Sequence, residues 1–134
     1  MRDVYVENEL SYIYLIVTNN GGYVGETHSP IGRVKQHQYN RKSDKQIGLH
    51  EDMRKGGYHL YILDVRLGVC GSELEGKWIT YFKHYFESRG KKSWNTAQTN
   101  TQGWEDCQES MPYIKHLFSW FPDHTVIENW DVCR

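Results

Sequence analysis

The sequence predicts a small α+β domain, in which a three-stranded antiparallel sheet is flanked by helices. Short segments rich in aromatic and β-branched residues alternate with stretches that begin with helix-capping residues and carry apolar side chains at helical spacing. The length of 134 residues fits one domain. With 38% hydrophobic and 14% aromatic residues, the chain has enough apolar side chains to build a core.

The first two strands should form a hairpin. Residues 12–17 are aromatic and β-branched and predict a strand, and residues 19–22 read Asn-Asn-Gly-Gly, a strong turn signal. Residues 23–25 then resume as a second short strand.

Three helices and a third strand follow. Ser29 and Pro30 predict an N-cap and first helical residue, with the helix running to about Arg41. The capping-box spacing of residues 43–46 predicts a second helix that ends at the glycines 56 and 57. Residues 58–65 predict a strand, and residues 72–90 predict an amphipathic helix with a second capping-box start.

The C-terminal part is harder to assign. We expect residues 91–111, which are polar, to form a loop or extended segment, residues 111–121 a short helix, and residues 125–127 a last short strand. Residues 1–103 should form the main domain, with residues 104–134 as an acidic, aromatic extension packed on it. The aromatic residues of this extension also allow a homodimer interface.

The formal net charge of −1 hides a segregation along the chain. Residues 1–27 carry a net charge of −3, residues 28–103 of +6, and residues 104–134 of −4. A basic middle is what phosphate binding needs, although a solvated surface of mixed charge is the commoner fate of such residues.

Cysteine content and hydropathy indicate the compartment. Three cysteines without a C-x-x-C pair argue against a disulfide framework or a zinc site. The longest apolar run is far too short to span a bilayer, and no signal-peptide core follows Met1. We therefore expect a cytoplasmic protein with no membrane partner.

An ordered set of residues carries the functional signal. Tyr12-Ile13-Tyr14 is followed across the turn by Tyr23-Val24-Gly25, and Arg33 and His37 lie one helical turn apart in the first predicted helix. Glu75 opens a later helix, and Asn95 follows that helix. In this order and on these elements, the set resembles the GIY-YIG nuclease family over roughly residues 11–96.

The resemblance implies a role for each residue. Tyr23 would be the general base and Tyr14 would position the water. Arg33 would grip the scissile phosphate, and His37 would shuttle a proton or bind a phosphate oxygen. Glu75 would bind Mg²⁺ or Mn²⁺, and Asn95 would orient a group in the site.

Each residue also has a plainer interpretation. Glu75 fits a capping box that starts at Ser72, and either tyrosine fits an ordinary aromatic strand position. Arg33 could form a surface ion pair, His37 could be a structural histidine, and Asn95 could cap a turn.

The sequence departs from the family pattern at two positions. Tyr12 replaces the first glycine of the motif, and Glu26 stands where many members have lysine. An acid near a phosphate would weaken its attraction, or the side chain would turn outward.

DNA contacts are expected from basic residues on both sides of the site. They would bind the phosphate backbone without choosing a sequence. The candidates are Lys35, Arg41, Lys42, Lys45, Lys91 and Lys92.

The sequence therefore predicts a metal-dependent DNA endonuclease, free-standing and of a phage, mobile-element or restriction type, in a bacterial or phage-infected cell. The alternative is a DNA-binding or interaction module that keeps the fold but has lost turnover, an idea prompted by Tyr12 and Glu26.

Overall fold

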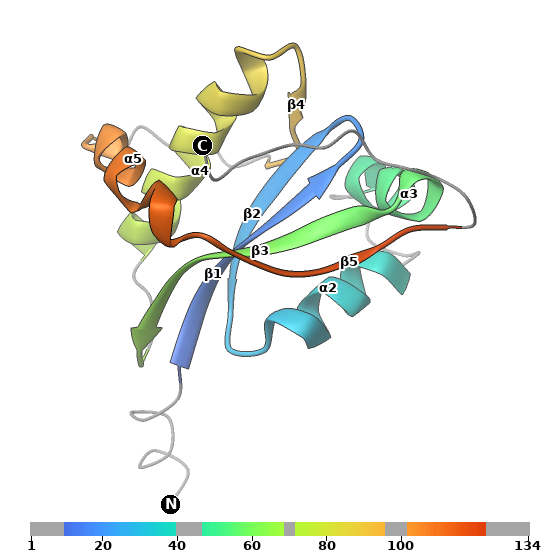
Figure 1. Cartoon of the computed structure of the whole chain (residues 1–134), viewed down its shortest axis with the longest axis horizontal. Coiled ribbons are helices and arrows are strands. Elements are labelled where there is room, and N and C mark those ends of the chain that lie inside the picture. The colour runs from blue at the N-terminus through green and yellow to red at the C-terminus, as the bar shows by residue number, and fades with distance from the viewer. Residues whose placement is uncertain (1–9, 40–46, 69–71, 96–101, 123–134) are drawn as a thin grey trace, which may run out of the picture.

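The computed structural model describes residues 10–39, 47–68, 72–95 and 102–122, and it confirms the α+β class. Figure 1 shows a sheet with helices on both sides. In chain order the elements are β1 (Leu10–Thr18), β2 (Gly21–Thr27), α2 (Pro30–Tyr39), α3 (Ile47–Gly56), β3 (Tyr58–Leu67), α4 (Ser72–Glu87), β4 (Lys92–Ser93), the 3₁₀ turn η2 (Trp104–Asp106), α5 (Cys107–Ser110), the 3₁₀ turn η3 (Met111–Tyr113) and β5 (Lys115–Trp120).

The predicted three-stranded antiparallel sheet is wrong, because the sheet has five strands in the order β4-β2-β1-β3-β5. The three expected strands form its antiparallel centre. β5 adds to the free edge of β3 in the antiparallel sense, and the two-residue β4 pairs in parallel with β2 through Gly21 and Gly22. The sheet is therefore mixed.

β1 is the central strand, and both of its faces are covered. Ile13, Leu15 and Val17 belong to one apolar core, together with residues of α4 and α5. Tyr14 and Ile16 belong to a second core, together with residues of α2 and α3. Because side chains alternate along a strand, one aromatic and β-branched segment fills two cores. The layers are therefore α2 and α3, then the sheet, then α4 and α5 (Figure 1).

The predicted hairpin is confirmed, with a tighter connection than expected. Only Asn19 and Asn20 separate β1 from β2, because the following glycines already belong to β2. The buried Asp52 of α3 holds this turn, since its carboxylate accepts hydrogen bonds from the backbone N–H of Asn20 at 3.1 Å and from its side-chain amide at 2.7 Å.

The predictions of the first three helices are confirmed where the structure describes them. α2 begins at Pro30, and α4 runs from Ser72 to Glu87, with Gly90 at a φ of 71° just after it. α3 ends at the predicted glycine pair. The predicted start of that helix at residues 43–46 lies outside the described residues, as does the predicted strand at 125–127.

The predicted helix over residues 111–121 is wrong. A single 3₁₀ turn at Met111–Tyr113 is followed by the strand β5. The aromatic rings of Phe118 and Trp120 pack on Tyr58 of β3, with centroid distances of 5.8 and 6.0 Å. Pairing with an otherwise open sheet edge outweighs the weak local preferences of these residues.

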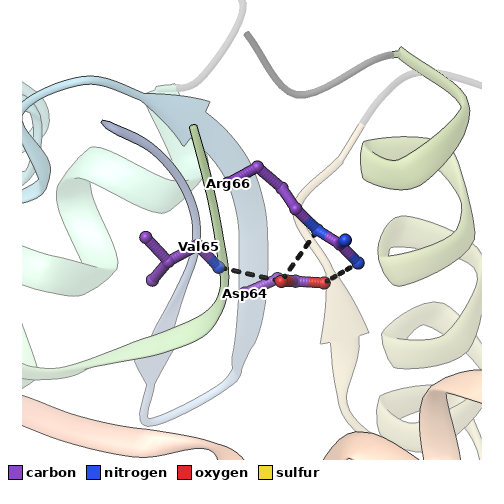
Figure 2. A network of polar contacts seen from close by, with 3 residues as sticks. All are labelled: Asp64, Val65 and Arg66. Carbon is purple, nitrogen blue, oxygen red and sulfur yellow. Dashed lines mark hydrogen bonds and ion pairs between the residues drawn. The ribbon is translucent and has the colours of Figure 1, made fainter. Parts of the chain in front are cut away.

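β3 continues past the end of β5 toward Leu67, and its exposed end is held by local polar contacts. Figure 2 shows the carboxylate of Asp64 accepting a hydrogen bond from the N–H of Val65 at 2.8 Å and pairing with Arg66 at 3.3 Å. This pair is exposed and is worth at most about 1 kcal/mol. Arg66 belongs to the basic middle segment, and its charge is paired with the neighbouring carboxylate of Asp64.

Within the described ranges, no helix has both the length and the apolar character needed to cross a membrane.

Candidate active site

The two tyrosines of the predicted site lie on neighbouring strands and face the same side of the sheet. Their ring centroids are 6.2 Å apart, and each tyrosine acts on the pKa of the other. Tyr14 is 2% exposed and lies opposite Gly25 of β2. A Cβ at position 25 would come within 2.3 Å of the Tyr14 hydroxyl oxygen, so only glycine leaves room for this ring.

Helix α2 brings Arg33 and His37 to the tyrosines. A hydrogen bond of 3.1 Å joins His37 Nε2 to the Tyr14 hydroxyl, and the His37 ring meets the Tyr23 ring edge-on at 5.2 Å. Arg33 is exposed, and its charge acts on both tyrosines and on His37. The i, i+4 spacing in the sequence therefore places both side chains toward one point.

His50, which no sequence motif marks as a site residue, lies directly behind His37. His50 lies on α3 and is 2% exposed, and its Nε2 is 3.0 Å from His37 Nδ1. Tyr14, His37 and His50 thus form a continuous hydrogen-bonded chain that leads into the core between α2 and α3. The only signal in the sequence was the density of histidines between residues 28 and 59.

The remaining predicted residues lie along the outer edge of β2. β4 pairs with β2 only as far as Gly22, and beyond that point side chains take over the backbone hydrogen bonds. The amide of Asn95 accepts from Val24 N–H at 2.9 Å and donates to Val24 O at 2.8 Å. Glu75 lies in the first turn of α4, close enough to Glu26 of β2 that burial and then the charge of Glu26 raise the pKa of its carboxyl group.

Glu26 is directed to the same place as Glu75. It follows Val24 by two residues, so its side chain emerges on the face of the sheet that α4 covers. Its Oε2 is buried and finds no hydrogen-bond partner among the described residues. The outward orientation considered for Glu26 on sequence grounds is therefore not the one observed.

Burial governs the pKa values of the site. Desolvation raises the pKa of Tyr14 and Tyr23 above the ordinary value of 10.0; the charge of Glu75 raises both further, and Arg33 partly offsets this effect. Desolvation and the neighbouring His50 lower the pKa of His37 from 6.5 to about 4. Desolvation and the charge of Glu26 raise the pKa of Glu75. At neutral pH both phenols and the His37 imidazole are therefore uncharged.

The candidate DNA contacts that the structure describes flank this site. Lys35 is exposed on α2, two residues after Arg33. Lys91 and Lys92 lie near the start of β2, where Lys91 donates a hydrogen bond to Asn19 O at 3.1 Å and Lys92 pairs with Gly21. Arg41, Lys42 and Lys45 lie outside the described residues.

The site offers oxygen ligands of the kind that Mg²⁺ and Mn²⁺ prefer. Among the described residues, no group of three or more His, Cys, Asp or Glu side chains comes together to hold a metal ion. Glu75 and Glu26 are the two acids that approach each other beside the tyrosines. The unpartnered Oε2 of Glu26 is a buried acceptor that a cation would satisfy.

Comparisons with known proteins add no relative: no family model, no curated protein and no solved structure matches the chain.

Proposed function

We propose that this chain is a divalent-metal-dependent DNA endonuclease of the GIY-YIG type, which hydrolyses phosphodiester bonds. The observation that supports the proposal is that the predicted site residues come close together in space. Residues far apart in the sequence, selected by their resemblance to one family motif, lie close together in the structure. Tyr14 contacts Tyr23 and His37, Asn95 bonds the backbone of β2, and the charge of Glu75 acts on both tyrosines.

The chemistry is in-line attack of a water molecule on a phosphodiester, during which negative charge builds up on the phosphoryl oxygens. A divalent cation bound at Glu75 would stabilise that charge and the leaving oxygen. Arg33, exposed at the mouth of the site, would hold the phosphate through its planar guanidinium.

The hydrogen-bonded chain gives the proton of the attacking water a route. Both phenols are neutral, so neither serves as a ready-made base. Tyr23 accepts the proton from water as the network passes a proton through Tyr14 to His37, whose uncharged Nε2 lies 3.1 Å from the Tyr14 hydroxyl. The low pKa of His37 keeps it free of a proton, and thus able to accept one, at neutral pH.

The test is cleavage of supercoiled plasmid DNA with Mg²⁺ or Mn²⁺, with and without chelator. DNAs from several bacterial and phage sources serve as substrates because the recognition sequence is open. We expect nicked or linear product only when the cation is present. The ratio of nicked to linear product, read together with the oligomeric state, shows whether two copies cut both strands.

Replacing Glu75 with alanine should reduce cleavage by about 1000-fold or more, because several kcal/mol of charge stabilisation are lost with the cation. The matched control is Glu73→Ala, since Glu73 is an exposed acid in the same helical turn. Equal activity of the two variants would contradict the assignment of Glu75.

A second function, DNA binding without turnover, is favoured by one observation. Glu26 places a second acid beside Glu75 where many members of the family have lysine, and its Oε2 is buried without a hydrogen-bond partner among the described residues. Gel-shift and cleavage assays on the same DNAs separate the two functions. A protein that shifts DNA in the gel but leaves every DNA intact at all cation concentrations would support the binding module.

A further inference from the structure

Two histidines and a serine lie together at the edge of the sheet that β5 forms. His59 belongs to β3, and His116 and Ser119 belong to β5, which pairs with β3 (Figure 1). His59 Nδ1 is 3.3 Å from His116 Nε2. The Ser119 hydroxyl is hydrogen-bonded to the first of these nitrogens and lies 2.8 Å from the second. Three polar atoms from two strands therefore meet at one point.

A bulge in β5 makes this meeting possible. The pairing between β3 and β5 shifts by one residue, with Leu117 as the extra residue of β5. In a regular strand His116 and Ser119 would point to opposite faces, because they are three residues apart. The bulge reverses this alternation, so both side chains reach His59. Bulges that re-aim a side chain in this way are common beside functional sites.

The separation of the two ring nitrogens fits a tetrahedral metal ion. Two nitrogens bound to one tetrahedral Zn²⁺ at about 2.0–2.1 Å each lie about 3.3–3.4 Å apart. In a square-planar Cu²⁺ site with similar bond lengths, neighbouring nitrogens lie about 2.8–3.0 Å apart. The 3.3 Å between His59 Nδ1 and His116 Nε2 matches the tetrahedral value. The spacing therefore favours Zn²⁺ over Cu²⁺.

Aromatic packing holds both imidazoles in position and leaves them accessible. The Tyr61 ring lies 6.2 Å from the ring of His59 and 5.1 Å from that of His116, measured between centroids. Phe121 packs edge-on against His59 at 5.4 Å. His59 is half-buried and His116 is exposed. An ion can therefore reach the two nitrogens from solvent, and little side-chain ordering remains to oppose its binding.

We propose that His59 and His116 are the protein ligands of a Zn²⁺ ion that joins the edge strand β5 to β3. The Ser119 hydroxyl, which bonds both nitrogens, would move aside by rotation to another staggered rotamer. Water molecules would complete the tetrahedron. Imidazole nitrogens suit Zn²⁺, whereas Mg²⁺ prefers oxygen ligands, so the site selects a different ion from the one proposed for Glu75.

This site is separate from the candidate active site. His59 pairs with Val17 of β1 and shares its face of the sheet, whereas Tyr14 points to the other face. The inference therefore does not rest on the proposed function.

The direct test is a Zn²⁺ titration of the full chain, followed by NMR of the imidazole nitrogens. Excess Mg²⁺ in the buffer occupies sites that are built from oxygen ligands. We expect the signals of His59 and His116 to move together with one midpoint. His84, an exposed histidine of α4, serves as the internal control and should not move at that midpoint. Signals of His59 and His116 that stay in place, or that move only as His84 does, would overturn the proposal.

Variants distinguish a metal site from a cluster held only by hydrogen bonds. His59→Gln and His116→Gln should each weaken Zn²⁺ affinity by about tenfold or more, because each removes one of two imidazole ligands. Ser119→Ala should bind Zn²⁺ at least as tightly as the wild type, because it removes a hydroxyl that competes for both nitrogens. Competition with a zinc indicator measures the affinities, and His84→Gln is the matched control. Wild-type affinity in folded His59→Gln and His116→Gln would contradict the assignment.

Thermal unfolding supplies a second readout. Zn²⁺ should raise the melting temperature of the wild type, because the ion binds the folded chain and links two strands of it. The gain should persist in Ser119→Ala and disappear in His59→Gln and His116→Gln, and an equal gain in all three would count against the site. None of these measurements involves DNA, so their outcome is independent of whether the chain is a nuclease.

Discussion

Two histidine pairs with almost the same internal geometry lie in very different surroundings. The nitrogens of His37 and His50 are 3.0 Å apart and their ring centroids 5.2 Å apart, and the corresponding values for His59 and His116 are 3.3 and 5.3 Å. The first pair lies between α2 and α3, and the second lies on the β3–β5 edge beside Ser119. The contact between two imidazoles therefore does not distinguish a candidate active site from a surface cluster.

The neighbours of each pair make the distinction. His37 bonds the Tyr14 hydroxyl, and the charges of Arg33 and Glu75 act on the same group of side chains. His59 and His116 share the hydroxyl of Ser119, and Tyr61 packs on both rings. Burial and the partner histidine lower the pKa of His37 and of His59, and for His37 the shift reaches about 4. The second pair thus supplies matched control variants for the first.

The largest expected effect separates the two pairs directly. His37→Ala should reduce DNA cleavage by about 100-fold or more, because it removes the acceptor of the proton route. His116→Ala should cleave at the rate of the wild type. Single-turnover plasmid cleavage at saturating Mg²⁺ measures both variants. Similar losses of cleavage rate in the two would contradict a special role for the His37–His50 pair.

The next effect tests the hydroxyl that links the first pair to the site. Tyr14→Phe keeps the buried ring but deletes the bond to His37, so we expect cleavage to fall by roughly 10–100-fold. Tyr61→Phe is the matched control, because Tyr61 is also a buried strand tyrosine that packs against a histidine of its pair. Circular dichroism establishes that both variants fold.

A smaller effect is expected for His50, which acts through His37 as a positioning residue. His50→Gln should lower cleavage by about tenfold, since second-layer partners orient the group that reacts. NMR titration should also show the pKa of His37 rising from about 4, because the charge of His50 contributes to its depression. An unmoved His37 pKa would contradict a direct coupling, and His116→Gln is the control.

The smallest effect concerns stability against acid. The pKa of His37 is about 4 in the folded chain and 6.5 ordinarily, so the unfolded chain binds more protons between these values. Stability from this group is therefore full above pH 6.5 and falls as the pH drops toward 4, by about 1–3 kcal/mol in total. Denaturant unfolding at several pH values should show a shallower acid loss for His37→Gln, and a parallel curve would exclude His37 as the cause.

The strands of the hairpin and the start of α2 were predictable because local rules specify them. Residues 12–17 are mostly aromatic or β-branched, which favours a strand, and apolar cores cover both faces of β1. Ser29 and Pro30 specify a helix start through capping and a fixed backbone angle. Such signals act within a few residues and need no distant partner.

β5 was mispredicted because its partner decides its conformation. The segment Lys115–Trp120 has no run of β-branched residues, and it becomes a strand by pairing with Tyr58–Ile62 and stacking on Tyr58. Among the site residues, Tyr14, His37 and Glu75 were selected by their resemblance to the GIY-YIG motif, read on elements that the sequence made recognisable. The position of His50 could not be predicted, because its contact depends on how α3 packs against α2.

The sequence by itself determined the α+β class, the hairpin and the helix starts, because these follow from side-chain periodicity, turn residues and capping, which are short-range effects. The residues of the proposed chemistry were selected by their resemblance to the GIY-YIG motif. Only the tertiary structure decided the five-stranded order, the chain from Tyr14 through His37 to His50, and the approach of Glu26 to Glu75. Those features depend on which surfaces pack together, and burial then sets the charge state of each group at the site.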